Sequence, residues 1–145
     1  MEFKLKPFKI QLTVSRIANI HYFEFTHNYN TKGDRHAFCE LVYVDSGALH
    51  IRADNFCGAL TENQMILHGA NETHSLACPD DSAPNVIIIG FECECEALAP
   101  FSRRAVTLSE PLKRLLAEII REGRAVFLPP YDKPNVTDMK KRENY

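Results

Sequence analysis

The segment with the clearest chemical potential is Asp34-Arg35-His36-Ala37-Phe38-Cys39-Glu40, where a histidine and a glutamate lie four residues apart. If it is a β-strand, alternate residues project from one face: His36, Phe38, Glu40, Val42 and Val44. Two titratable groups then lie among apolar neighbours, as in the polar spot of an otherwise apolar pocket. Leu41 and Tyr43 project from the other face, so we expect a strand that is covered on both sides.

The elements that must position this pair are short strands. Apolar or alternating runs of three to ten residues, separated by Asn-, Asp- and Gly-containing turns, follow one another through about the first hundred residues. The expected strands cover residues 9–14, 20–25, 37–44, 48–53, 56–60, 65–67, 74–78 and 86–95. Many short strands at this spacing predict a sandwich or closed barrel and exclude a βαβ fold.

The hydrophobic period then changes to that of a helix. One apolar stripe recurs at i, i+3, i+4, i+7 and i+8: Leu112, Leu115, Leu116, Ile119 and Ile120. Ser109 is the expected N-cap and Gly123 the expected C-terminal stop. The stripe needs a surface to cover it, which is either the outer face of the barrel or the same helix of a second copy.

Composition limits the function classes. The 145 residues carry a net charge of −2, which argues against direct binding to nucleic acid. The N-terminus has no apolar run long enough for a signal peptide or a membrane span, so we expect a cytoplasmic protein.

The cysteines are expected to be reduced and mostly buried: Cys39, Cys57, Cys78, Cys93 and Cys95. Small apolar filler is the favoured interpretation of Cys93 and Cys95, with a soft-metal site as the alternative.

These residues resemble the cupin superfamily, and more closely the N-terminal sensor domain of AraC-family bacterial transcription regulators. The stretch from His36 to Gly47 keeps the second histidine, the glutamate and the glycine of the first cupin motif, while Asp34 replaces its first histidine. The second motif is matched by residues 63–74, with Asn63 and Asn71 where glycines are usual; asparagine tolerates a positive φ better than most residues do. The run Glu40-Leu41-Val42-Tyr43-Val44-Asp45-Ser46-Gly47 resembles the AraC type in particular.

The resemblance implies a mainly β fold, the cupin double-stranded β-helix or jelly-roll barrel, with a C-terminal α-helix. It implies a small-molecule effector, by family analogy a sugar, bound by His36, Phe38, Glu40, Val42 and His74. Phe91 and Met65 are also expected to face the interior. The N-terminal arm, residues 8–15, is expected to close over the ligand.

The same resemblance leaves two interpretations of the histidines open. His36, Glu40 and His74, with Asp34 as a possible fourth, could hold iron, manganese, nickel or zinc. The favoured interpretation needs no cofactor and treats His36 and Glu40 as pocket or structural groups. His68 is expected to be a surface or turn histidine, with a place near His74 as the alternative, and His50 is expected to face solvent.

We therefore expect no enzyme but the effector-sensing and dimerisation domain of a regulator, with a metal-dependent cupin dioxygenase or isomerase, or a stand-alone small-molecule-binding cupin, as alternatives. The expected layout is a barrel with its arm (1–106), an amphipathic helix (107–124) and a Pro-rich, charged linker (125–145). The linker would lead to a helix-turn-helix domain that is absent here and supplies the DNA contact. The helix stripe is the expected homodimer interface.

Overall fold

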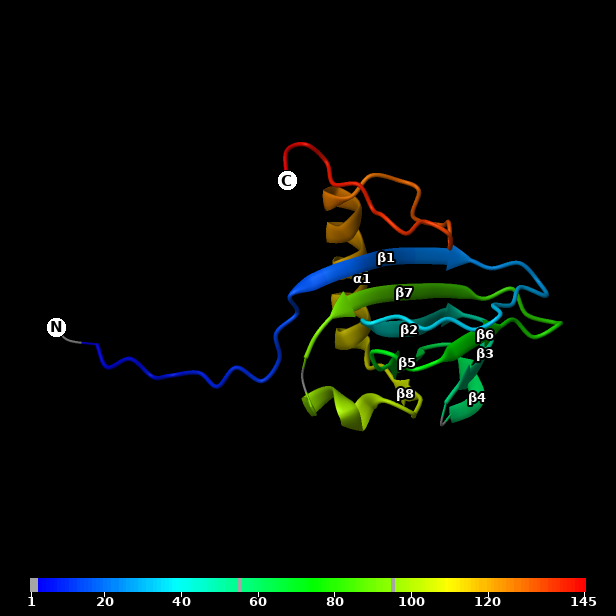
Figure 1. Cartoon of the computed structure of the whole chain (residues 1–145), viewed down its shortest axis with the longest axis horizontal. Coiled ribbons are helices and arrows are strands. Elements are labelled where there is room, and N and C mark those ends of the chain that lie inside the picture. Colours follow the sequence, from blue (N-terminus) through cyan, green and yellow to red (C-terminus); the bar gives the residue numbers. More distant parts are fainter. Residues whose placement is uncertain (1–2, 55, 95) are drawn as a thin grey trace.

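Two antiparallel β-sheets form the body of the protein (Figure 1). The computed structural model describes residues 3–54, 56–94 and 96–145. The larger sheet has the order β1 (Arg16–Glu24), β7 (Asn85–Glu92), β2 (Cys39–Ser46), β5 (Gln64–His68) and β8 (Val106–Thr107). The smaller sheet has the order β4 (Phe56–Thr61), β3 (Ala48–Ala53) and β6 (His74–Ala77). A 3₁₀ helix, η1 (Glu96–Phe101), and one long helix, α1 (Glu110–Val126), complete the fold.

Alternating side chains give the larger sheet two different apolar faces. Its inner face meets the smaller sheet in the interior cluster, whose buried members are Phe23, Phe25, Val42, Val44, Leu49, Ile51, Leu60, Ile66, Leu76, Cys78, Val86 and Ile88. Its outer face meets α1 in the helix-side cluster, whose buried members are Ile20, Tyr43, Ile87, Ile89, Leu116 and Ile120. Strand β2 contributes to both, so the expectation that it is covered on both sides is confirmed.

Helix α1 crosses behind the strands of the larger sheet (Figure 1). Ser109 is its N-cap, as expected, although its side chain makes no capping hydrogen bond. The expected stop at Gly123 is wrong, because the helix continues to Val126. Gly123 instead permits close packing on β1: a Cβ atom there would lie 2.9 Å from Cδ1 of Ile20.

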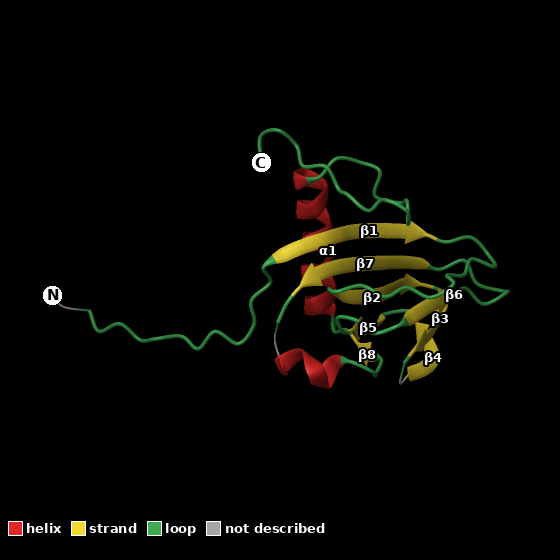
Figure 2. Cartoon of the chain, in the orientation of Figure 1, coloured by secondary structure: helices red, strands yellow, loops and turns green. Residues whose placement is uncertain are grey.

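The chain on either side of the barrel departs from expectation. The predicted strand at residues 9–14 is wrong, because this arm has no regular secondary structure and extends away from the body (Figure 2). A strand needs a neighbouring strand for its backbone hydrogen bonds. The expected linker folds back along the outer edge of β1, where Tyr131 O accepts a hydrogen bond from Tyr22 N at 3.2 Å.

Of the cysteines, Cys39 and Cys78 are buried, Cys93 is half-buried and Cys57 is exposed, and all four are free thiols. The expectation of mostly buried thiols therefore holds for two of these four. Cys95 lies outside the described residues, and the two interpretations of Cys93 with Cys95, apolar filler and soft-metal site, therefore stay predictions. Within the described residues, no helix is both long and apolar enough to cross a membrane.

Candidate ligand pocket and metal centre

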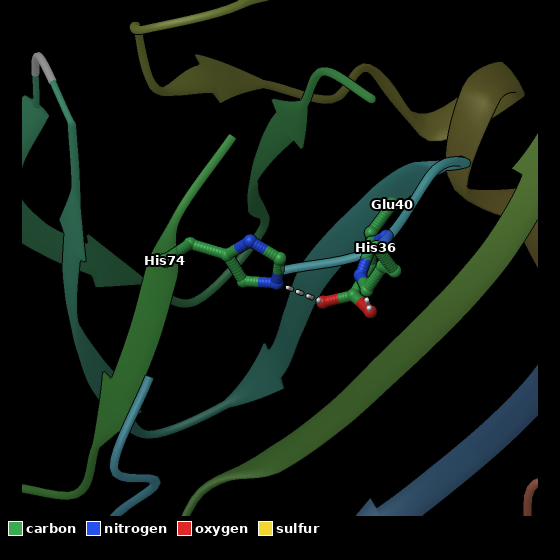
Figure 3. Close-up of side chains that lie close together, drawn as sticks. All are labelled: His36, Glu40 and His74. Carbon is green, nitrogen blue, oxygen red and sulfur yellow. Dashed lines mark ion pairs between the residues drawn. The ribbon is translucent and has the colours of Figure 1, made fainter. Parts of the chain in front are cut away.

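His36, Glu40 and His74 meet inside the barrel near one end (Figure 3). Glu40 lies on β2 and His74 at the start of β6, so the two sheets bring them together. His36 Nε2 lies 3.3 Å from Glu40 Oε2, and His74 Nε2 lies 3.3 Å from Glu40 Oε1. The carboxylate is therefore held between two imidazoles, as the resemblance implied.

His36 reaches this position by a route that differs from the predicted one. Strand β2 begins at Cys39, so His36 and Phe38 precede it and the predicted strand from residue 37 is too long at its start. The His36 ring instead stacks on the Phe38 ring, with centroids 3.8 Å apart and planes inclined by 6°. Gly90 makes room for this pair, since a Cβ atom there would lie 2.8 Å from the Phe38 ring.

Main-chain carbonyls fix the orientation of both imidazoles. His36 Nδ1 lies 2.8 Å from the carbonyl oxygen of Phe38, and His74 Nδ1 lies 3.1 Å from that of Glu72. A carbonyl can only accept, so each Nδ1 carries the proton, and in the neutral ring Nε2 presents a lone pair. Both lone pairs face the Glu40 carboxylate. The arrangement is favourable only if a cation, either a proton on Nε2 or a metal ion, lies between the ring and the carboxylate.

The electrostatics of the cluster follow from this placement. Burial raises the pKa of Glu40, but the two imidazoles beside its carboxylate, His36 and His74, outweigh burial and lower that pKa from 4.5 to about 2. Burial lowers the pKa of His74, but Glu40 outweighs it, so the pKa of His74 is raised above 6.5. Glu40 is thus ionised at neutral pH, and its charge favours the protonated form of His74.

The same residues fit a divalent transition metal. Their three ligand atoms lie within 4.8 Å of one another. Nε2 of His36 is buried and has no hydrogen-bond partner. Metal-bound histidines usually donate their other ring N–H to a carbonyl or carboxylate, as His36 and His74 do here. Asp34, the possible fourth ligand, is exposed and is not part of this group; it pairs with His74 through the backbone.

His68 is the first residue that the sequence interpretation misplaced. It is fully buried, with 0% exposure, so a surface or turn position is wrong. Its ring stacks on His74, with centroids 4.2 Å apart and planes inclined by 8°. Burial, followed by the neighbouring His74, lowers its pKa to about 4. The alternative place near His74 is thus confirmed; the β2–β5 register puts His68 directly opposite Glu40, a pairing that no local sequence pattern indicates.

His21 is the second residue that sequence reasoning missed, because no pattern in the sequence assigns it a role. It is buried, and it shares the inner face of β1 with Phe23. Its Nδ1 lies 3.2 Å from the carbonyl oxygen of Tyr131, so it donates to the C-terminal segment. Burial lowers its pKa. His50, by contrast, is exposed on β3 as expected.

A cavity of about 80 Å³ adjoins the cluster inside the barrel. Glu40, His74 and His21 form its polar end, and three ring residues that the sequence interpretation did not single out form an apolar wall. These rings stack in series: Phe23 on Phe25 at 5.2 Å and Phe25 on Tyr29 at 4.2 Å between centroids.

The predicted apolar pocket residues have different places. Val42 is fully buried in the interior cluster, and Phe38 is half-buried against His36. Met65 and Phe91 are not interior residues, because both pack in the helix-side cluster. The error arose because a continuous apolar run gives no alternation from which to choose the inner face.

Comparisons with known proteins give structural matches only. No protein-family model and no curated protein sequence matches the chain. ToxT from Vibrio cholerae O395, bound to (E)-4-(8-methylnaphthalen-1-yl)but-3-enoic acid, matches with a TM-score of 0.52 and 14% identity over 79% of this chain and 49% of that one. ToxT from Vibrio cholerae strain SCE256, bound to an unsaturated fatty acid, matches with a TM-score of 0.51 and 11% identity over 83% of this chain and 49% of that one.

The chain thus spans about half the length of these ToxT chains. A likeness at 11–14% identity concerns the fold alone. An RmlC-like cupin from Shewanella frigidimarina NCIMB 400 also matches, with a TM-score of 0.43 and 16% identity over 66% of this chain and 87% of that one. The predicted fold class is confirmed: the protein is a mainly β, cupin-type barrel of antiparallel sheets with a C-terminal α-helix.

Proposed function

We propose that this chain is the effector-sensing and dimerisation domain of an AraC-family transcription regulator in the bacterial cytoplasm. The observation that carries the proposal is the barrel cavity, which joins the Glu40–His74 pair to a wall of stacked aromatic rings. ToxT, an AraC-family regulator with the same fold, has been solved with carboxylic acids bound. No covalent chemistry is required of the pocket.

The pocket favours a small molecule with both a polar and an apolar part. Hydroxyl or carboxyl groups suit the end formed by Glu40, His74 and His21, while a hydrocarbon surface suits Phe25 and Tyr29. A sugar satisfies both requirements, since its hydroxyls form hydrogen bonds and its C–H face packs on aromatic rings. The effector would alter the arrangement of downstream DNA-binding domains only if it bound two arrangements with different affinity.

The dimerisation part of the proposal concerns the exposed half of the α1 stripe. Leu116 and Ile120 are buried in the helix-side cluster, whereas Leu112, Leu115 and Ile119 are 49%, 61% and 45% exposed. These three residues lie at i, i+3 and i+7, the spacing of one helix face. Antiparallel packing against the same face of a second copy would cover them.

Ligand binding is tested by thermal shift and calorimetry on the whole chain. The probes are neutral pentoses and hexoses, and the naphthyl butenoic acid found in ToxT. We expect a rise in Tm with at least one probe, weakened at least tenfold in affinity by Phe25→Leu, which alters the apolar wall. His50→Ala, on the exposed face of β3, is the matched control. Binding that survives Phe25→Leu and is lost in His50→Ala would contradict the barrel pocket.

A second candidate function is a metal-dependent cupin enzyme that uses His36, Glu40 and His74. The observation in its favour is the pair of Nδ1–H anchors, which turn two Nε2 lone pairs toward one carboxylate. A bound transition metal would supply Lewis-acid or redox chemistry there.

Elemental analysis of protein purified without chelator discriminates between the two functions. Near-stoichiometric iron, manganese, nickel or zinc that is lost in His74→Ala and retained in His50→Ala would favour the metal-dependent function. Metal at trace level in all three proteins would leave His36 and Glu40 as pocket groups.

A further inference from the structure

The C-terminal strap, defined here as residues 127–142, forms a closed loop on the end of α1. Its two ends are held together, since Leu128 N donates to Lys140 O at 2.8 Å and Arg142 N donates to Val126 O at 2.9 Å. Within the loop, the Tyr131 hydroxyl donates to Phe127 O at 2.9 Å. The Arg124 guanidinium lies 5.4 Å from the centre of the Tyr131 ring. The strap is therefore attached to α1 more extensively than a free linker would be.

The strap also reaches the pocket. The carbonyl oxygen of Tyr131 accepts from Tyr22 N at 3.2 Å, and His21 Nδ1 lies at the same distance from it. Pro134 lines the cavity together with Glu40 and His74. Pro134 thus brings into the pocket lining a segment about a hundred residues distant in sequence from β1 and β2. Figure 1 shows this C-terminal segment beside β1.

The cavity is too small for a metabolite. Its volume is about 80 Å³, whereas small-molecule pockets usually measure about 300–1,000 Å³. Most of the other lining residues belong to hydrogen-bonded strands, and β1 alone pairs with β7 over nearly its whole length. The strap meets β1 through far fewer backbone contacts, at Tyr22 N and, with the Met139 sulfur as acceptor, at Ile20 N. Enlargement of the cavity at the strap therefore leaves the strand ladders intact.

We propose that the strap is the movable wall of the pocket, and that a ligand larger than the present cavity binds by displacing the strap, through Tyr131 and Pro134, from β1. Pro134, the strap residue that lines the cavity, then sets the size limit of the ligand. Because the strap continues directly from α1, its displacement reports pocket occupancy to the helix and to the chain that follows. The reporting role rests on the proposed sensing function, whereas the opening of the strap can be measured without any ligand.

Native-state hydrogen exchange of the whole chain, read by NMR, tests the opening. Tyr22 N–H faces the strap, so Phe23 N–H, one residue further along an antiparallel ladder, faces β7. We expect the Tyr22 amide to exchange at least tenfold faster than the Phe23 amide, because the strap opens without unfolding of the barrel. Equal and slow exchange of both amides would overturn the proposal.

Two variants and a control sharpen this test. Tyr131→Gly/Pro134→Gly should accelerate Tyr22 exchange about a further tenfold and leave Phe23 unchanged. Asp132→Ala is the matched control, because the structure gives its exposed side chain no hydrogen bond or ion pair among the described residues. The proposal is also overturned if the Tyr22 and Phe23 amides are accelerated equally, both in the double variant and in the milder Pro134→Gly. That result would show that the strap is an integral part of the barrel fold.

Access to the pocket provides an independent readout. Diethyl pyrocarbonate should modify His21, which lies under the strap, at least threefold faster in the double variant than in Asp132→Ala. His68, deeper in the barrel, should stay unmodified in both. Equal His21 rates would overturn the movable wall and leave the sensing function standing. A ligand screen in which no probe binds would contradict the sensing function and leave the movable wall standing.

Discussion

The same strands form both faces of the larger sheet, but the two faces are stabilised in different ways. On the helix side, Leu116 and Ile120 pack on Ile20, Tyr43 and neighbouring isoleucines, and the buried members of the cluster are all apolar or aromatic. On the interior side, the apolar cluster is interrupted at one end by Glu40, His68 and His74, all of them buried.

The difference shows where each face obtains its stability. The helix side depends on close packing, so it is most sensitive to substitutions that change the shape of a packed side chain. The interior end depends on compensation of charge, because a buried carboxylate is tolerated only when cations or donors face it. Four substitutions separate these contributions, and their expected effects decrease in the order given.

Leu116→Glu should unfold the protein. Leu116 is 5% exposed and lies in the helix-side cluster, so the substitution would bury an unpaired charge. Leu116→Ala should cost about 3 kcal/mol, the usual range for a buried leucine. Circular dichroism and urea unfolding at fixed protein concentration measure both. A folded, monomeric Leu116→Glu would instead place Leu116 in a dimer interface and contradict this packing.

Glu40→Gln should lower the free energy of unfolding by about 3 kcal/mol at pH 7, because the Glu40 pKa is lowered from 4.5 to about 2. A lowered carboxyl pKa stabilises the fold above the unfolded-state value and loses that effect as pH falls. The difference between wild type and variant should therefore shrink between pH 4.5 and pH 2.

The Glu40 measurement uses urea unfolding of chelator-treated protein across that pH range. Gln64→Glu, on the same sheet at a half-buried position, is a control for a generic change of one charge. A wild-type advantage that stays constant down to pH 2 would contradict the role of the carboxylate charge.

Gly123→Ala should destabilise the protein by about 1 kcal/mol and lower Tm by about 3 °C. Alanine favours a helix over glycine, but its Cβ would lie 2.9 Å from Cδ1 and 3.1 Å from Cγ2 of Ile20. Gly69→Ala, where an added Cβ meets nothing within 4 Å, is the control. Calorimetry that shows a higher Tm for Gly123→Ala would mean that Ile20 moves aside without cost.

Leu115→Ser should change the free energy of unfolding of the monomer by about 0.5 kcal/mol or less, because the side chain is 61% exposed. Under the proposed dimerisation it should nonetheless weaken self-association. Sedimentation velocity over a concentration series measures this. Arg121→Ser, on the exposed surface of the same helix, should leave association unchanged.

The sequence predicts most strands because the local pattern determines them. Leu49 and Ile51 alternate with His50 and Arg52, and the predicted strand 48–53 coincides with β3. Asn63 and Asn71 have φ values of 67° and 65°, the left-handed conformation for which asparagine is suited. The Glu40–His74 pair was located through the motif resemblance.

Features that depend on distant contacts were not predictable in this way. His68 joins the cluster because of the β2–β5 register, and His21 meets Tyr131 across 110 residues of sequence. The split of the α1 stripe has the same origin, since the pattern gives a face but not how much of it the sheet covers. The predicted strand at residues 9–14 shows the converse, a strand-like alternation with no strand beside it.

Main-chain carbonyls, those of Phe38 and Glu72, anchor His36 and His74. This has a consequence for sequence variation among related proteins. A carbonyl belongs to every amino acid, so no substitution at position 38 or 72 can delete the acceptor. Related sequences can therefore vary at position 72 and still present the same nitrogen atom of His74 to Glu40, whereas position 38 also supplies the ring on which His36 stacks. A search for similar sites should compare the backbone shape around both histidines as well as the residue types beside them.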